Sequence, residues 1–385
     1  MVSAVRRGAS LRSVARAFRV SLLTVQRWVG RARGQRLDRV EWADRPSTPR
    51  RVRRTAPAVE DLVLELRREL KETSDLGEFG AAAIQRELRA RGLAAIPSLR
   101  TISRILERRG ALDGRRRVRR APPPRGWYLP QVAEGEAELD SFDIVEGLVI
   151  KSGPHVDVLT ATSLHGALVD AWPAPGVTAR LAVDALVTRW RAVGLPGYAQ
   201  FDNDTRFQGP HQHPDALGRV VRLCLSLGVV PVFAPPRETG FQAAIESLNG
   251  RWQAKVWARF QHASLAALEE RSARYVAASH RRHAARAEGA PARRPFPADW
   301  RLDLAAPARG RVIFLRRTSA QGAASLLGHS FTVNPLWPHR LVRAEVDLTA
   351  GVIRCYGLRR REPREQPLLR ELPYELPRRR RPFAQ

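Results

Sequence analysis

Three stretches of the sequence decide the fold: Ala137-Glu-Leu-Asp-Ser-Phe142, Gln200-Phe-Asp-Asn-Asp204 and Ala244-Ile-Glu-Ser-Leu-Asn-Gly-Arg-Trp252. Each carries an acidic residue in a different structural context. Alternating and apolar residues around the first two predict strands, and the third falls in a long stretch with helical character. The acids of interest are therefore in a first strand, at the end of a later strand, and on a helix.

The segments around these stretches predict an α/β domain. Strands are expected first, and helices and strands then alternate, an order of the ribonuclease-H kind. The expected strands are 137–150, 155–162, 166–172, 198–201 and 229–234, and the expected helices are 178–193, 217–227 and 242–283.

Acids from three such elements can meet at one point and hold divalent metal. Cutting and joining phosphodiesters requires an activated oxygen nucleophile and neutralisation of the leaving oxygen, which two Mg²⁺ ions on carboxylates provide. Mn²⁺ can substitute at such a site. Asp202 and Glu246 supply two of the acids, and Asn203, Asn249 and Arg251 are supporting residues beside them.

The first strand offers two acids, Asp140 and Asp143. Their odd spacing places them on opposite faces of a regular strand, so only one can join the site. The residues alone leave this choice open.

The sequence motifs around the acids resemble those of the DDE transposase and integrase superfamily, and in particular those of the retroviral-integrase-like transposases of bacterial insertion sequences. The likeness covers nearly all of the chain. It rests on Glu138-Leu-Asp140, Phe201-Asp-Asn203, the Pro235 to Gly240 loop, Glu246-Ser-Leu-Asn-Gly-Arg-Trp252, and Tyr275 with His280-Arg-Arg-His283.

The resemblance implies that Asp140, Asp202 and Glu246 are the catalytic, metal-binding triad of a DNA transposase. It implies two Mg²⁺ ions, double-stranded DNA as element end and target, and a homodimer or higher oligomer on that DNA. Asp204 and Ala243 depart from the usual pattern, and so does the long interval from Asp202 to Glu246. Residues 209–214 contain two histidines of that interval and predict an exposed loop.

The N-terminus predicts a DNA-binding helix-turn-helix over residues 1–35. Ser10 and Ser21 are suited to cap two short helices separated by a tight turn. A helical hairpin with a solvated basic face is the alternative. The exposed face of the second helix offers Thr24, Gln26, Arg27 and Arg31 to DNA.

Residues 57–112 predict a second helix-turn-helix, of winged type, built from three helices. Its last helix begins at Pro97-Ser98 and presents Arg100 and Arg104. A small helical bundle without groove contacts is the alternative reading.

Basic segments flank this second domain. Residues 36–56, with Arg51 and Arg53, and residues 113–133, with Arg116 and Arg117, predict linkers that contact phosphates.

After the catalytic core at 134–285, a linker is expected over 286–310, with Arg293 and Arg294 available to DNA. Short strands over 311–360 predict a small β-barrel, and 361–385 a basic tail. The overall class is multidomain: helical DNA-binding domains, an α/β core and a β-barrel.

Composition agrees with a polyanionic partner. The chain of 385 residues carries 66 Lys and Arg against 38 Asp and Glu, a net charge of +28. Such an excess attracts phosphate. The sequence shows no apolar run that would span a membrane and no signal peptide, and it has only Cys224 and Cys355, so a bacterial cytoplasmic, nucleoid-associated location is expected.

Two other functions remain open. The first is a catalytically silent, transposase-derived DNA-binding protein with a regulatory or architectural role. The second is a ribonuclease-H-like RNA nuclease, which paired helix-turn-helices disfavour because they suit B-form grooves.

Overall fold

The computed structural model describes residues 1–44, 55–112, 125–151 and 153–377, in two compact units, Met1–Pro57 and Ala58–Gln385. The expected residues Arg51, Arg53, Arg116 and Arg117 lie outside the described residues. No helix in the described ranges is both long enough and apolar enough to cross a bilayer.

The first unit is a cluster of short helices. Ser10 and Ser21 cap the second and third, as expected: the Ser10 side chain accepts from the Ser13 amide and that of Ser21 from the Thr24 amide. Val14, Ala15 and Val25 form the contact between these helices. The elements are α1 (Val2–Arg6), α2 (Leu11–Ala17), α3 (Leu22–Arg31) and a 3-10 turn, η1 (Leu37–Arg39).

The second unit begins with three helices around one apolar cluster. Leu66, Ile84 and Ile105 are fully enclosed there. Residues 57–112 contain no strand, so the expected wing is missing from this described segment. The helices are α4 (Pro57–Thr73), α5 (Ala81–Ala90) and α6 (Leu99–Arg108).

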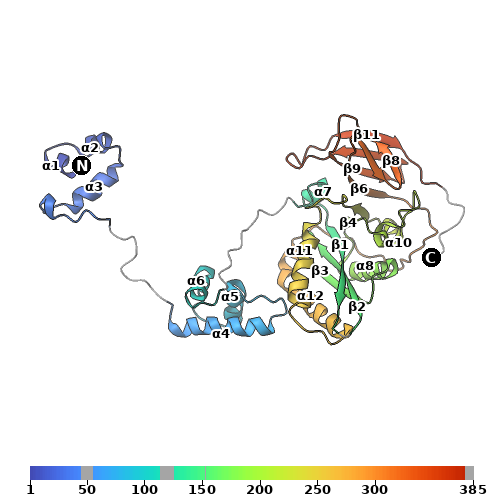
Figure 1. The fold of residues 1–385 in the computed structure, drawn as a ribbon, viewed down its shortest axis with the longest axis horizontal. Coiled ribbons are helices and arrows are strands. Elements are labelled where there is room, and N and C mark those ends of the chain that lie inside the picture. The colour runs from blue at the N-terminus through green and yellow to red at the C-terminus, as the bar shows by residue number, and fades with distance from the viewer. Residues whose placement is uncertain (45–54, 113–124, 152, 378–385) are drawn as a thin grey trace. The chain divides into compact units, whose positions relative to one another are not determined.

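A nine-stranded sheet dominates the rest of this unit, in the order β11-β10-β9-β6-β5-β4-β1-β2-β3 (Figure 1). β1, β2 and β3 pair antiparallel, and β4 and β5 run parallel to β1, which agrees with the ribonuclease-H order. These strands are β1 (Leu139–Val149), β2 (His155–Ser163), β3 (Val169–Ala174), β4 (Tyr198–Phe201) and β5 (Val230–Phe233).

Helices cover both faces of this part of the sheet. Trp190 of α8 and Leu223 of α10 pack with Phe142 on one face, whereas Ile245 of α11 and Tyr275 of α12 pack with Val145 on the other. Figure 1 shows α8 and α10 on one side and α11 and α12 on the opposite side. The helices are α7 (Pro130–Ala133), α8 (Ala179–Val193), α9 (Thr205–Gln208), α10 (Arg219–Ser226), α11 (Ala243–Trp252), the π-helical turn η2 (Gln253–Trp257) and α12 (Leu265–Glu288).

The C-terminal strands extend this sheet and do not form the separate barrel expected over 311–360. β6 pairs parallel to β5 through Val232↔Ile313 and Phe233↔Phe314. A strand inside the expected tail also pairs, so the tail assignment of 361–385 is wrong for its described part. The strands are β6 (Arg311–Arg317), β7 (Ala323–Leu326), β8 (His329–Thr332), β9 (Leu341–Asp347), β10 (Val352–Gly357) and β11 (Leu368–Pro373), with β7 and β8 in a hairpin of their own.

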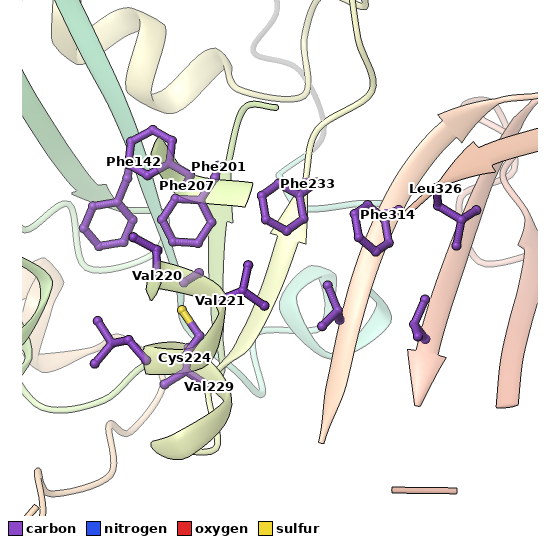
Figure 2. Packing of buried hydrophobic residues seen from close by; sticks show 14 of the residues in the cluster. Phe142, Phe201, Phe207, Val220, Val221, Cys224, Val229, Phe233, Phe314 and Leu326 are labelled. Atoms are coloured by element: carbon purple, nitrogen blue, oxygen red, sulfur yellow. The ribbon is translucent and has the colours of Figure 1, made fainter. Parts of the chain in front are cut away.

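A row of phenylalanines joins the two parts of the sheet. Phe142, Phe201, Phe233 and Phe314 come from the adjacent strands β1, β4, β5 and β6, with neighbouring ring centroids 5.4, 6.0 and 5.3 Å apart (Figure 2). All four rings are fully buried. The C-terminal strands therefore share one core with the acid-bearing strands.

Two expected linkers are also packed into this core. Trp127, Tyr128 and Leu129 are buried against the sheet, because an apolar run follows the basic one. After α12, Arg294 forms a backbone bridge with Leu195 and donates to the carbonyls of Leu227 and Gly228. Arg294 therefore holds the segment to the core, although the residue itself is exposed.

The phenylalanine row predicts a large stability effect at Phe314. Phe314→Ala removes a fully buried ring and should lower the free energy of unfolding by about 3–5 kcal/mol, measured by urea denaturation. Leu336→Ala is the control, because Leu336 is 84% exposed, and its midpoint should not move. Equal effects of the two changes would contradict the shared core.

Candidate active site

The two acids of β1 point to opposite faces of the sheet, as strand alternation requires. Asp140 lies on the α8 face and is completely buried. Its carboxylate accepts from Arg189 Nε at 3.0 Å, Trp190 Nε1 at 3.1 Å and Arg293 Nη1 at 3.2 Å. Asp140 is therefore an internal ion-pair residue and does not reach Asp202 or Glu246.

The arginines around Asp140 explain why its charge is tolerated. Burial on its own raises the pKa of Asp140, but Arg189 and Arg293 together outweigh this and hold the pKa at about 2. Arg189 also pairs with Asp170 on β3. Arg293 comes from the segment after α12, so this segment completes the network. Because Arg293 pairs with the buried Asp140, its side chain is not available to DNA.

Asp143 occupies the other face, beside α11. Its Oδ2 accepts from Asn249 Nδ2 at 2.7 Å, and its Oδ1 from the amide of Ile144 at 2.9 Å. Thr160 Oγ1 donates to Asn249 Oδ1 at 2.7 Å and so fixes which way the amide faces. Asp143, not Asp140, is thus the β1 acid that joins the candidate site.

Electrostatics link Asp143 to the other two acids. Burial, together with the negative charges of Asp202 and Glu246, raises the pKa of Asp143 to about 6 against two hydrogen bonds that lower it. Burial likewise raises the pKa of Asp202, while the hydrogen bond from the Asp204 amide lowers it and the charge of the Asp204 carboxylate raises it. Asp143 therefore lies close enough to Asp202 and Glu246 for their negative charges to act on it.

Asp202 and Glu246 reach this region from different elements. Asp202 follows the last residue of β4, and its Oδ1 accepts from the Asp204 amide at 3.0 Å. Glu246 lies in the first turn of α11 and is exposed, three residues before Asn249 and on the same helix face. Asp204 does not compete with them, because it caps α9 and pairs with Arg206.

The donor set fits a divalent cation. Carboxylate oxygens are the ligands that Mg²⁺ and Mn²⁺ accept, and a cation would relieve the repulsion that raises the pKa of Asp143. Across the described ranges no three acidic, histidine or cysteine side chains are already placed to hold a metal ion. These residues therefore suit a divalent cation by their ligand type and their charge.

The supporting residues have different neighbours. Asn203 Nδ2 donates to the carbonyl of Ala234 at 2.7 Å, and its Oδ1 accepts from Arg316 Nη2 at 2.8 Å. Arg251 is exposed, and its charge acts on Tyr275 and His283, away from the acids. Sequence reasoning missed Arg316, which comes from β6 and had no visible link to the core.

The expected DNA-binding side chains of the helical segments divide into two groups. Gln26, Arg27, Arg100 and Arg104 are exposed. Thr24 and Arg31 are half-buried and have partners within the chain: Thr24 Oγ1 lies 2.7 Å from Ser21 Oγ, and Arg31 packs over Trp28 and pairs with Glu41 at 3.7 Å.

Comparison with solved structures finds retroviral integrases. The catalytic core of BIV integrase matches at 16% identity and a TM-score of 0.27, over 36% of this chain and 80% of that chain. An HTLV-2 integrase catalytic core in complex with magnesium matches at 13% identity and 0.27, over 35% and 81%. A simian T-cell lymphotropic virus intasome in complex with the PP2A subunit B56 gamma matches at 14% and 0.33, over 70% and 87%.

No protein-family model matches the chain, and neither does any curated protein sequence.

The pairing of Asp140 predicts a pH-dependent loss of stability in Asp140→Asn. The change leaves Arg293 without its carboxylate and Arg189 with Asp170 alone, and should cost about 3–5 kcal/mol near neutral pH, measured by urea denaturation. Because the folded pKa of Asp140 is depressed to about 2, its contribution is complete above the unfolded pKa of about 4 and lost as pH falls toward 2. The difference from wild type should shrink over that interval.

Asp143→Asn is the matched control, because it makes the same change three residues along the strand. Burial raises the pKa of Asp143, so removing its charge should not destabilise the protein at neutral pH. A loss of stability in Asp143→Asn as large as that in Asp140→Asn would contradict the assignment of the two faces.

Proposed function

We propose that the chain is a DNA transposase that binds element ends and catalyses DNA cleavage and strand transfer. What supports this proposal is that Asp143 lies on the α11 face of β1, where the charges of Asp202 and Glu246 act on it. Asp143 replaces Asp140 in the triad that the sequence resemblance implied. A net charge of +28 supports a nucleic-acid substrate.

Two divalent ions, when bound, would activate an oxygen nucleophile and neutralise charge on the leaving oxygen of a phosphodiester. The residues of this chain prepare the ligands. Asn249 donates a hydrogen bond to Asp143 and holds its carboxylate in one orientation, and Thr160 orients the Asn249 amide by donating to its oxygen. The Asp204 amide fixes Asp202, and the exposed face of α11 carries Glu246.

The helical segments supply DNA binding in this proposal. In the first unit α2 and α3 form the helix-turn-helix, and α3 presents Gln26 and Arg27. In the second unit α6 presents Arg100 and Arg104. Two element ends must be processed together, so the active species is proposed to be a homodimer or a larger assembly on DNA.

Carboxylate substitutions test the catalytic proposal. In a nicking and strand-transfer assay with Mg²⁺ and labelled DNA containing the sequences that flank the gene, Asp143→Asn and Glu246→Gln should abolish product while DNA binding persists. Asn249→Ala should reduce the rate by about 10–100-fold, because it releases the orientation of Asp143.

Wild-type protein is the reference for this assay. If the protein binds the DNA tightly but wild type yields no nicked or joined strand with Mg²⁺ or Mn²⁺, a silent, transposase-derived DNA-binding protein becomes the better account. Cleavage that persists in Asp143→Asn would contradict the revised triad.

An exposed glutamine tests the DNA-binding face of α3. Gln26→Ala should weaken binding to the same DNA by about 1–3 kcal/mol if the side chain reads a base in the major groove. Gln35→Ala is the matched control, because Gln35 is exposed in the same unit but lies beyond α3. Fluorescence anisotropy measures both, and equal affinities of the two variants would argue against groove contact by α3.

A further inference from the structure

A cavity of about 470 Å³ lies between the segment that follows Asp202 and the C-terminal strands. Its walls come from the segment after α9, the loop after β5, the end of β6, and the β7-β8 hairpin. Asn203, the residue after Asp202, is part of the lining. The volume lies within the range of small-molecule sites.

Arg316 places a buried positive charge in the wall of this cavity. The residue is 8% exposed. Its guanidinium donates to the carbonyls of Ser325 at 3.0 Å and Leu315 at 2.9 Å, and to Asn203 Oδ1 at 2.8 Å. A further bond goes to the carbonyl of Ala234 at 3.3 Å.

All four of these acceptors are neutral. Within the described ranges no carboxylate pairs with Arg316, and its four hydrogen bonds leave one of its five donor hydrogens without an acceptor. Burial lowers the pKa of Arg316 to about 10, so the side chain is still charged at neutral pH. The neighbouring Arg317 differs, because it pairs with Glu238. Arg316 is thus a buried cation that an anionic ligand would neutralise.

A second lining residue has an unused hydrogen-bonding group. The side-chain oxygen Oε1 of Gln208 is buried and has no hydrogen-bond partner among the described residues. A buried acceptor without a donor is unfavourable. A ligand that carries an N–H group would satisfy it.

The walls of the cavity are held in place by close backbone packing. The Gly218 amide donates to the Gln208 carbonyl at 2.9 Å, and a Cβ on Gly209 would lie 2.6 Å from Gly218 N. At the other wall, the Asp215 amide donates to the Leu327 carbonyl at 2.9 Å, and Tyr374 Oη donates to Asp215 at 2.7 Å. The cavity therefore exists before a ligand arrives.

We infer that this cavity binds one nucleotide of the DNA strand that passes the acids, with its phosphate against Arg316 and a base N–H against Gln208. The inference rests on the proposed function, because that function brings DNA to Asp202. A nucleotide unstacked from the duplex presents both groups at once, as in other enzymes that extrude a base.

Two substitutions test the cavity in the full chain. Ser325 is exposed on β7 and lines the cavity, so Ser325→Trp should fill the space without disturbing the fold. Ser330 is exposed directly across the hairpin and does not line the cavity, which makes Ser330→Trp the matched control. Gln208→Met keeps the side-chain length and removes the amide, both the unpaired acceptor Oε1 and the donor Nε2, and should leave the thermal midpoint unchanged.

The probes are deoxyadenosine monophosphate, deoxyadenosine and inorganic phosphate, followed by ligand-observed NMR titration. Wild type should bind the monophosphate more tightly than either fragment. Ser325→Trp and Gln208→Met should weaken that binding by about tenfold, whereas Ser330→Trp should not change it. Inorganic phosphate binding as tightly as the monophosphate, or Ser325→Trp binding like wild type, overturns the inference.

Glu246→Gln separates this inference from the proposed function. The variant should lose DNA cleavage and keep the affinity for the monophosphate, because Glu246 does not line the cavity. If neither the wild type nor any variant cuts DNA, the proposed function fails. The titration still decides whether the cavity binds a nucleotide. If wild type cuts DNA and Ser325→Trp cuts at the same rate, the role of the cavity in DNA binding fails alone.

Discussion

The structure of the second unit depends on the ion pairing of Asp140 inside the protein. A carboxylate removed from water needs compensating charge and hydrogen bonds; here two arginines provide the charge, and the indole of Trp190 adds a neutral hydrogen bond. This network ties β1 to α8 and to the segment after α12. Since β1 alternates, the same pairing that turns Asp140 inward turns Asp143 toward α11. The acid cluster on one face is thus fixed by the salt bridges on the other.

Much of the local structure follows from the sequence because its causes are local. Ser10 and Ser21 cap helices through bonds to amides three residues on, and the strand and helix order from β1 to α11 follows from spacing of apolar residues. The choice between Asp140 and Asp143 was not local. Alternation showed that only one of them joins the site, but the partners that decide which are 49 and 153 positions away, at Arg189 and Arg293.

The C-terminal strands show the same limit in another form. Alternation and turn residues predict strands at 311–316, 341–347 and 352–356, and these strands exist. Which strand pairs with β6 depends on residues far apart in the sequence. The same pattern of strands is compatible with a small barrel and with an extended sheet. One signal was present: Val312 to Leu315 form an unbroken apolar run, and all four are buried, as in a strand with both faces covered. An exposed barrel strand would alternate.

The route of the chain through the Asp140 network has a consequence for protein synthesis. Domains fold from the N-terminus as the ribosome extends the chain. The strand that carries both acids is made early, yet Asp140 has only Arg189 as its guanidinium partner until residue 293 has been added. The edge of β5 that pairs with β6 likewise has no partner strand until β6 has been synthesised. The nascent core therefore stays incomplete for more than a hundred codons, and its last-made strands finish it.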